Sequence, residues 1–161
     1  MRKKILITGG AGFVGSQIAI SFKRSYEDVD VVAFDNLHRN GSELNIPRLK
    51  ALEIEFVKGD VRSKNDLEDL GEISFLVECS AEPSVLAGKG GDTSYLIDTN
   101  LSGAVNCAEK CRKCNAPMIF LSTSRIYPIK PLLDCNISEN ATRLELSNEQ
   151  AVPGLSKHGV S

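Results

Sequence analysis

Three glycines and one aspartate stand at a spacing that suits the binding of a dinucleotide. Gly9, Gly12 and Gly15 follow the apolar run at residues 5–7 and fit the pattern G-x-x-G-x-x-G, and Gly10 gives an overlapping G-x-G-x-x-G. Such a turn lets a pyrophosphate approach the backbone and lie on the free N–H groups of a following helix. Asp35 comes 20 residues after Gly15, where a dinucleotide-binding unit carries the carboxylate that accepts from the adenosine ribose hydroxyls.

The charge of this aspartate also indicates which dinucleotide the site prefers. A carboxylate at the ribose repels a 2′-phosphate, so the sequence favours NAD over NADP. Arg39 lies close by in the chain and is the one nearby feature that favours NADP.

The elements that must position these residues alternate between apolar strands and amphipathic helices. Strands are expected at residues 4–7, 29–34, 54–57, 73–78 and 118–122. Helices are expected at 13–25, at 47–51, from a cap at Ser63 or Asn65 to Leu70, and from a cap at Asp92 or Thr93 to Lys113. This alternation predicts an α/β fold with a Rossmann-type, doubly wound parallel sheet, whose ligand lies beyond the carboxyl ends of the strands.

Composition narrows the classes of partner. The 161 residues carry a net charge of −2, and 25% of them are charged, which argues against a nucleic-acid or membrane surface. No apolar stretch is long enough to span a bilayer, and five cysteines without a secretory signal are expected to be free thiols. We therefore expect a cytoplasmic protein that binds neither nucleic acid nor membranes.

Several motifs in a fixed order resemble one protein family. The chain reads T-G-G-A-G-F-V-G, F-D-N-L, G-D-V-R, N-x-x-G-x-x-N and S-T-S-x-x-Y. In this order it is similar to the NAD-dependent nucleotide-sugar epimerases and dehydratases of the extended short-chain dehydrogenase/reductase family. The stretches at 34–41, 120–128 and 152–161 most resemble the CDP-paratose 2-epimerase group. A UDP- or dTDP-sugar 4-epimerase or 4,6-dehydratase is the alternative within the family.

The resemblance implies a set of cofactor contacts. Asp35 and Asn36 would bind the adenosine ribose. Asp60 and Val61 would flank the adenine, because a carboxylate can accept a hydrogen bond from its exocyclic amine. The small residues after the fourth strand would run along NAD, and Asn100 would lie near its nicotinamide half. The implied cofactor residues are Gly9, Gly12, Phe13, Val14, Gly15, Asp35, Asn36, Asp60, Val61, Ser80, Ala81, Glu82, Asn100 and Ser122.

Catalytic residues are incomplete in this sequence. The resemblance makes Thr123 the hydroxyl that contacts the reacting sugar, because it stands four residues before Tyr127. The family's Y-x-x-x-K motif is absent, since Lys130 follows Tyr127 by only three residues. A phenol without its lysine is a poor base at neutral pH. We therefore expect a truncated enzyme that is inactive alone, with the nucleotide-sugar substrate bound only by a full-length parent.

The expected organisation is an NAD-binding domain at 1–127 and a loop-rich tail at 128–161, where the missing catalytic and substrate region would begin. A sheet of five strands leaves one edge uncovered, which favours a homo-oligomer or a complementing chain. The alternative to an enzyme fragment is a non-catalytic NAD-binding module that needs a partner chain.

A cysteine cluster offers a different chemistry. Cys107, Cys111 and Cys114 have the spacing C-x-x-x-C-x-x-C of some iron–sulfur ligands. They fall within a helical pattern, so we expect a stripe of small side chains packed on the sheet and no metal site. His38 and His158 lie in polar loops and are expected at the surface.

Overall fold

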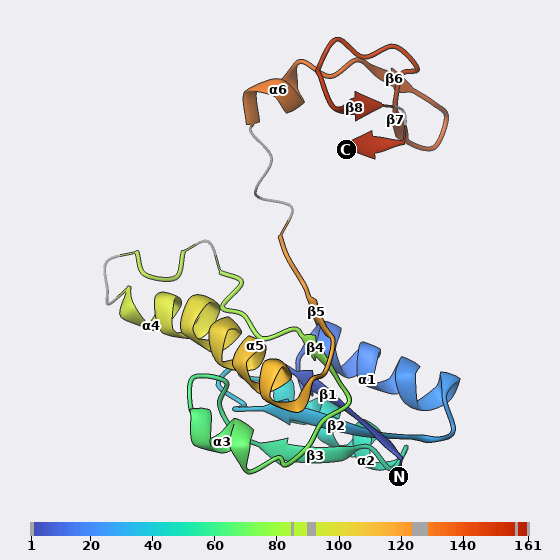
Figure 1. Cartoon of the computed structure of the whole chain (residues 1–161). Coiled ribbons are helices and arrows are strands. Elements are labelled where there is room, and N and C mark those ends of the chain that lie inside the picture. Colours follow the sequence, from blue (N-terminus) through green and yellow to red (C-terminus); the bar gives the residue numbers. More distant parts are fainter. Residues whose placement is uncertain (1, 85, 90–92, 124–128, 157, 161) are drawn as a thin grey trace. The chain divides into compact units, whose positions relative to one another are not determined.

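The chain forms two compact units, Met1–Leu121 and Ser122–Ser161. The computed structural model describes residues 2–84, 86–89, 93–123, 129–156 and 158–160 (Figure 1). None of the helices in these ranges is long and apolar enough to cross a membrane.

A five-stranded parallel sheet organises the first unit. Its strands are β1 (Lys3–Thr8), β2 (Val29–Asp35), β3 (Glu55–Lys58), β4 (Phe75–Glu78) and β5 (Met118–Phe120), in the order β3-β2-β1-β4-β5. All four pairings are parallel, which confirms the doubly wound sheet. The order reverses beside β1, and a ligand in such a sheet binds at this switch point.

Two cores lie against the sheet because side chains alternate between its faces. Ile5 and Ile7 of β1 pack in one core with Ala19 and Ile20 of α1 (Phe13–Ser25). Leu6 packs in the other core with the residues of α3 (Lys64–Glu68) and α5 (Gly103–Cys114) that face it. The remaining helical segments of this unit are η1 (Ser42–Asn45), α2 (Ile46–Lys50), α4 (Ser94–Ile97) and η2 (Asp98–Ser102).

The cysteine stripe belongs to the second core. Cys107 and Cys111 are buried there, and Cys114 packs against the same cluster, as the helical spacing predicts. Burial raises the pKa of the Cys107 thiol well above its usual range, so this thiol stays protonated and unreactive.

The long helix expected up to Lys113 is interrupted. A π-helical turn, η2, separates α4 from α5. Thr93 occupies the N-cap position of α4 without a side-chain capping bond, and Asp92 lies outside the described residues. The Ser63 cap is confirmed, since its hydroxyl accepts from the Asp66 N–H at 3.3 Å.

The last strand and the tail also differ from expectation. β5 ends at Phe120 and not at Ser122. It forms one edge of the sheet, where the side chains of Ile119 and Phe120 are exposed. The second unit, expected to be loop-like, contains a short helix and two small hairpins. Its elements are α6 (Ile129–Leu133), β6 (Ile137–Glu139) paired with β7 (Leu144–Leu146), and β8 (Leu155–Ser156) paired with β9 (Gly159–Val160).

Candidate functional site

A cavity of about 490 Å³ lies at the carboxyl ends of the first four strands. This volume is within the range of about 300–1,000 Å³ that small-molecule sites occupy. The lining residues come from the glycine turn, from the loops after β2, β3 and β4, and from α4 and η2. They are Gly9, Gly12, Phe13, Val14, Gly15, Phe34, Asp35, Asn36, His38, Arg39, Ser42, Gly59, Val61, Cys79, Ser80, Ala81, Glu82, Pro83, Tyr95 and Thr99.

The glycine turn forms one wall, and its geometry requires glycine. Gly9 has a φ of +61°, and a Cβ there would lie 2.7 Å from the Cys79 carbonyl oxygen. A Cβ on Gly15 would lie 2.1 Å from the Gly9 oxygen, which no packing tolerates. The N–H of Gly12 donates to that same oxygen at 2.9 Å. The turn therefore closes tightly and brings α1 against β1.

The amino end of α1 opens into the cavity. Gly12 is its N-cap and offers no side chain, and the first helical turn carries no acidic residue. The first backbone hydrogen bond of the helix runs from the Ser16 N–H to the Gly12 carbonyl, at 3.0 Å. The N–H groups of Phe13, Val14 and Gly15 therefore have no partner within the helix. Three free donors and the positive end of the helix dipole suit an anion such as a pyrophosphate.

Asp35 ties the glycine turn to the loop after β2 and keeps acceptor capacity. Its Oδ2 accepts from the Ala11 N–H at 3.1 Å, and its Oδ1 accepts from the Leu37 N–H at 2.8 Å. Leu37 adopts a φ of +57°, a conformation that is rare for leucine and common near functional sites. An ionised carboxylate has about four acceptor positions, so among the described residues each Asp35 oxygen keeps one. Two such positions match two adjacent ribose hydroxyls.

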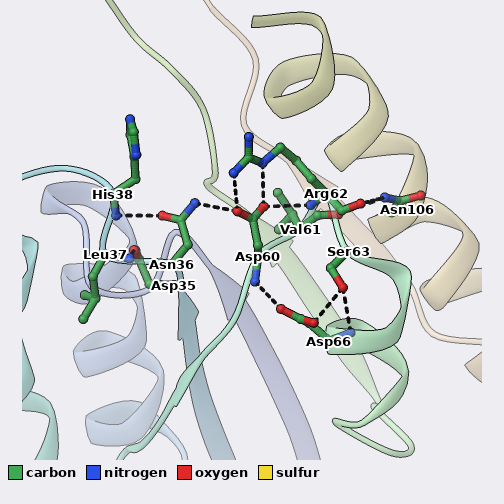
Figure 2. A network of polar contacts seen from close by, with 10 residues as sticks. All are labelled: Asp35, Asn36, Leu37, His38, Asp60, Val61, Arg62, Ser63, Asp66 and Asn106. Atoms are coloured by element: carbon green, nitrogen blue, oxygen red, sulfur yellow. Dashed lines mark hydrogen bonds and ion pairs between the residues drawn. The ribbon is translucent and has the colours of Figure 1, made fainter. Parts of the chain in front are cut away.

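Asp60 is different, because its carboxylate is fully engaged (Figure 2). Its Oδ1 accepts from the backbone N–H and the Nε of Arg62 at 2.9 and 3.0 Å. Its Oδ2 accepts from Nη2 of Arg62 at 2.7 Å and from Nδ2 of Asn36 at 3.0 Å. Four donors fill about four acceptor positions. Within the described residues Asp60 is thus held by Arg62 and Asn36, and its contact with an adenine amine stays a prediction.

Arg62 also dominates the electrostatics of this aspartate. Its side-chain hydrogen bonds, with smaller contributions from Asn36 and from the Arg62 backbone, lower the pKa of Asp60 to about 2, although burial opposes the shift. The carboxylate is therefore charged at every physiological pH.

This shift predicts a pH dependence of stability. A carboxyl whose pKa is lower in the folded state stabilises that state above its unfolded pKa of 3.8, and the contribution disappears as the pH falls towards 2. We expect Asp60→Asn to lower the free energy of unfolding at pH 5 and to have a smaller effect at pH 3. Urea unfolding at both pH values measures this, and an equal loss at the two values would contradict it.

The loop after β4 is held by the π-helical turn. The Glu82 N–H donates to Oδ1 of Asn100 at 2.8 Å, and Nδ2 of Asn100 donates to the Glu82 carbonyl at 3.4 Å. Ser80, Ala81 and Glu82 line the cavity, whereas Asn100 does not. Asn100 thus contacts the loop that faces the ligand space, and π-helical turns of this kind often occur at functional sites.

A buried carboxyl lies at the end of β4. Glu78 accepts from the Ser80 N–H at 2.9 Å and from the Thr8 hydroxyl at 3.4 Å. It is only 2% exposed, and burial raises its pKa. Glu78 does not line the cavity. Its hydrogen bonds instead join the carboxyl ends of β1 and β4. In the described parts of the chain, no three histidine, cysteine or carboxylate side chains lie close enough together to hold a metal ion.

The remaining predicted site residues lie in the second unit. Ser122 and Thr123 are both exposed. Ser124 and Tyr127 lie outside the described residues. Within the first unit, the structure brings together the predicted pyrophosphate, ribose and β4-loop residues. Asp60 and Asn100 do not line this cavity, but each forms a hydrogen bond with a residue that does.

Some cavity residues had no signal in the sequence. The Tyr95 ring lies 5.1 Å from the His38 ring, and the Arg62 guanidinium carbon lies 5.3 Å from the Tyr95 ring centre. His38 is exposed, as expected, and also lines the cavity. Its position three residues after Asp35 was the available clue, whereas nothing local marks Tyr95.

Comparisons with known proteins agree with this geometry. The model of the family described as "NAD dependent epimerase/dehydratase family" matches residues 5–157. The CDP-paratose 2-epimerase of Salmonella typhi is 37% identical over 133 residues, which cover 77% of this chain and 38% of that protein. The UDP-glucose 4-epimerase of Neisseria meningitidis serogroup B is 33% identical over 78% of this chain and 38% of its own length.

A solved structure shows the same likeness. The dTDP-glucose 4,6-dehydratase of Bacillus anthracis, determined in complex with NAD, is 25% identical with a TM-score of 0.65, and the match covers 93% of this chain and 44% of that one. The chain therefore spans less than half the length of these relatives.

Proposed function

The chain belongs to the NAD dependent epimerase/dehydratase family, and from this premise we propose that it is the NAD-binding part of a nucleotide-sugar epimerase. The observation that carries the proposal is the pairing of two features across one cavity. The first N–H groups of α1, which have no partner within the helix, face it from the glycine turn. Asp35 faces it too, and contacts with the described residues leave one acceptor position open on each of its oxygens.

The residues present fit this cofactor. The amino end of α1 would hold the pyrophosphate, Asp35 with Asn36 the adenosine ribose, and Val61 the adenine. Ser80, Ala81 and Glu82 would run along the nicotinamide half. A 2′-phosphate would lie against the charged Asp35, so NAD is preferred to NADP.

When bound, NAD would accept a hydride from the sugar and later return it. Thr123 is our candidate for the hydroxyl that contacts the reacting sugar, because a hydroxyl both donates and accepts. No tyrosine of this chain has a lysine four residues later. An unperturbed phenol has a pKa of about 10, so we propose that these 161 residues alone do not turn over a sugar nucleotide.

The substrate class follows from the relatives. The 37% identity to a CDP-paratose 2-epimerase supports a CDP-sugar, and the UDP-glucose 4-epimerase relatives make a UDP- or dTDP-sugar the alternative. Turnover would require a further segment or a second chain that supplies the tyrosine, the lysine and the sugar-nucleotide contacts.

Asp35→Ala tests the cofactor site. We expect it to weaken NAD binding about 10- to 100-fold, because hydrogen bonds to a charged group contribute about 1.5–3 kcal/mol. Calorimetry with NAD measures the change. Asp30→Ala is the matched control, since it removes the same charge from an exposed residue of β2, which pairs with Arg2 at 3.7 Å. Equal affinities of the two variants would exclude Asp35 from the site.

A second candidate is a module that binds NAD without catalysis. The absence of Y-x-x-x-K from the sequence favours it. The intact mass of the protein in its native cells separates the two candidates. A mass near 17.5 kDa supports the module with a partner chain, and a mass of roughly twice that or more supports an enzyme with its own substrate domain.

A further inference from the structure

Tyr95 lines the cavity together with Asp35 and Asn36, the residues proposed to bind the adenosine ribose. We propose that Tyr95 is a positioning residue that retains a bound dinucleotide by its adenosine half. It does so by completing a ring of contacts that joins three segments of the chain. The inference rests on the proposed binding of NAD at this cavity.

Hydrogen bonds form one part of this ring of contacts (Figure 2). The His38 N–H donates to Oδ1 of Asn36 at 2.9 Å, and Nδ2 of Asn36 donates to Oδ2 of Asp60 at 3.0 Å. Arg62 donates to both oxygens of Asp60, from Nε at 3.0 Å and from Nη2 at 2.7 Å. These bonds connect the loop after β2 to the loop after β3.

Tyr95 completes the ring of contacts from a third segment, α4. The centre of its aromatic ring lies 5.1 Å from the centre of the His38 ring. The guanidinium carbon of Arg62 lies 5.3 Å from the centre of the Tyr95 ring, which is within the range of a cation–π contact. Asn36, His38 and Tyr95 all line the cavity, so the ring of contacts borders it.

The Arg62 side of the ring is firmly held. Nδ2 of the buried Asn106 donates to the carbonyls of Val61 and Arg62 at 3.0 and 3.2 Å. The Arg62 side chain makes bidentate, charge-assisted bonds to Asp60, which are stronger than contacts between neutral groups. Tyr95 is only half-buried and reaches an exposed His38 ring at an interplanar angle of 38°. The ring of contacts is therefore weakest at Tyr95.

The surroundings of Tyr95 indicate how it would retain a ligand. It adds an apolar surface beside the polar side chains of the loop after β2 that line the cavity, among them Asp35 and Asn36. Aromatic rings at the edge of a binding site exclude water from the polar contacts beside them. Hydrogen bonds between Asp35 and a ribose are stronger when they are sheltered from water. Loss of the Tyr95 ring should therefore shorten the time for which the dinucleotide stays bound.

Tyr95→Ala tests this role through kinetics. We expect the dissociation rate constant of NAD, measured by surface plasmon resonance, to rise about tenfold, because lost contacts act mainly on dissociation. Tyr95→Phe keeps the aromatic ring and should release NAD within about twofold of the rate of the unaltered protein. Rescue by phenylalanine separates the ring contacts from any role of the hydroxyl.

Tyr26→Ala is the matched control. Tyr26 is 56% exposed, and its ring lies 5.8 Å from that of Phe22. The variant therefore removes a ring contact of the same kind from a residue that does not line the cavity. Its dissociation rate constant should stay within about twofold of the unaltered value. A tenfold rise in this variant as well would show that the loss is not specific to the cavity and would overturn the inference.

ADP-ribose shows which half of the dinucleotide Tyr95 retains. This compound carries the adenosine and the pyrophosphate but no nicotinamide. Tyr95→Ala should raise its dissociation rate constant by the same factor as that of NAD. A rise for NAD alone would assign Tyr95 to the nicotinamide half and overturn the inference.

His38→Ala tests the ring of contacts from its exposed member. We expect this variant also to release NAD faster, because Tyr95 then loses one of its two contacts. The double variant should be no faster than Tyr95→Ala, since residues that act as a unit are not additive. Rates that multiply in the double variant would overturn the inference. If circular dichroism shows that Tyr95→Ala does not fold, an unchanged rate in His38→Ala alone overturns it.

These outcomes also separate the inference from the function on which it rests. If the unaltered protein binds neither NAD nor ADP-ribose, the proposed NAD site fails and this inference with it. If it binds both, and Tyr95→Ala releases them no faster, the NAD site stands and only the role of Tyr95 fails.

Discussion

Gly12→Val is expected to abolish measurable NAD binding while the fold survives. Gly12 has a φ of −69° and a ψ of 174°, a conformation that valine adopts without strain. A Cβ at this position would lie 3.0 Å from the Gly9 oxygen, so the neighbouring backbone would have to move by a few tenths of an ångström. The two methyl groups would then stand where a pyrophosphate meets the N–H groups of α1. We expect the affinity, measured by calorimetry, to fall at least about 100-fold, which corresponds to about 2.7 kcal/mol.

The control for this variant separates binding from stability. Valine is a poorer N-cap than glycine, and the cost to the helix is about 1 kcal/mol, which thermal unfolding would detect. Gly12→Ala introduces the same Cβ without the methyl groups and should bind NAD with an intermediate affinity. An unchanged affinity of the valine variant would exclude the glycine turn as the pyrophosphate site.

Features encoded by neighbouring residues could be predicted from the sequence. The apolar run of β1, the glycines after it and Asp35 at the end of β2 each have a local signature. The alternation of strands and helices then fixes a parallel sheet, and its carboxyl edge brings the glycine turn, the Asp35 loop and the Ser80–Glu82 loop to one cavity, as found.

Features that depend on side-chain partners could not be predicted. G-D-V-R places Arg62 two residues after Asp60, but nothing in this spacing says that the guanidinium turns back to fill the carboxylate. The approach of Tyr95 to His38 joins residues far apart in the chain. It follows from where α4 lies relative to the loop after β2.

Two errors have other physical causes. The helix expected up to Lys113 depended on apolar spacing, but Ile97, Leu101 and Val105 are exposed, so that spacing carries no information about the π-helical turn. The hairpins of the second unit have strands of only two or three residues. Strands so short do not establish an alternating pattern, and the tail therefore resembled a loop.

Leu76→Ala is expected to cause a large loss of stability. Leu76 lies in β4 between Leu6 of β1 and Met118 of β5, and its side chain is 0% exposed in the core shared with α5. Truncation of such a leucine costs about 2–5 kcal/mol through lost burial and the cavity left behind. A domain has only about 5–15 kcal/mol of stability in total. Urea unfolding followed by circular dichroism should therefore show a much lower midpoint.

Leu44→Ala is the matched control, because it removes the same atoms from a side chain that is 73% exposed in η1. Its free energy of unfolding should stay within about 0.5 kcal/mol of the unaltered protein. Equal losses in the two variants would mean that β4 is not packed between β1 and β5. The loop at residues 80–82 follows β4 directly, so that result would also remove the support for one wall of the cavity.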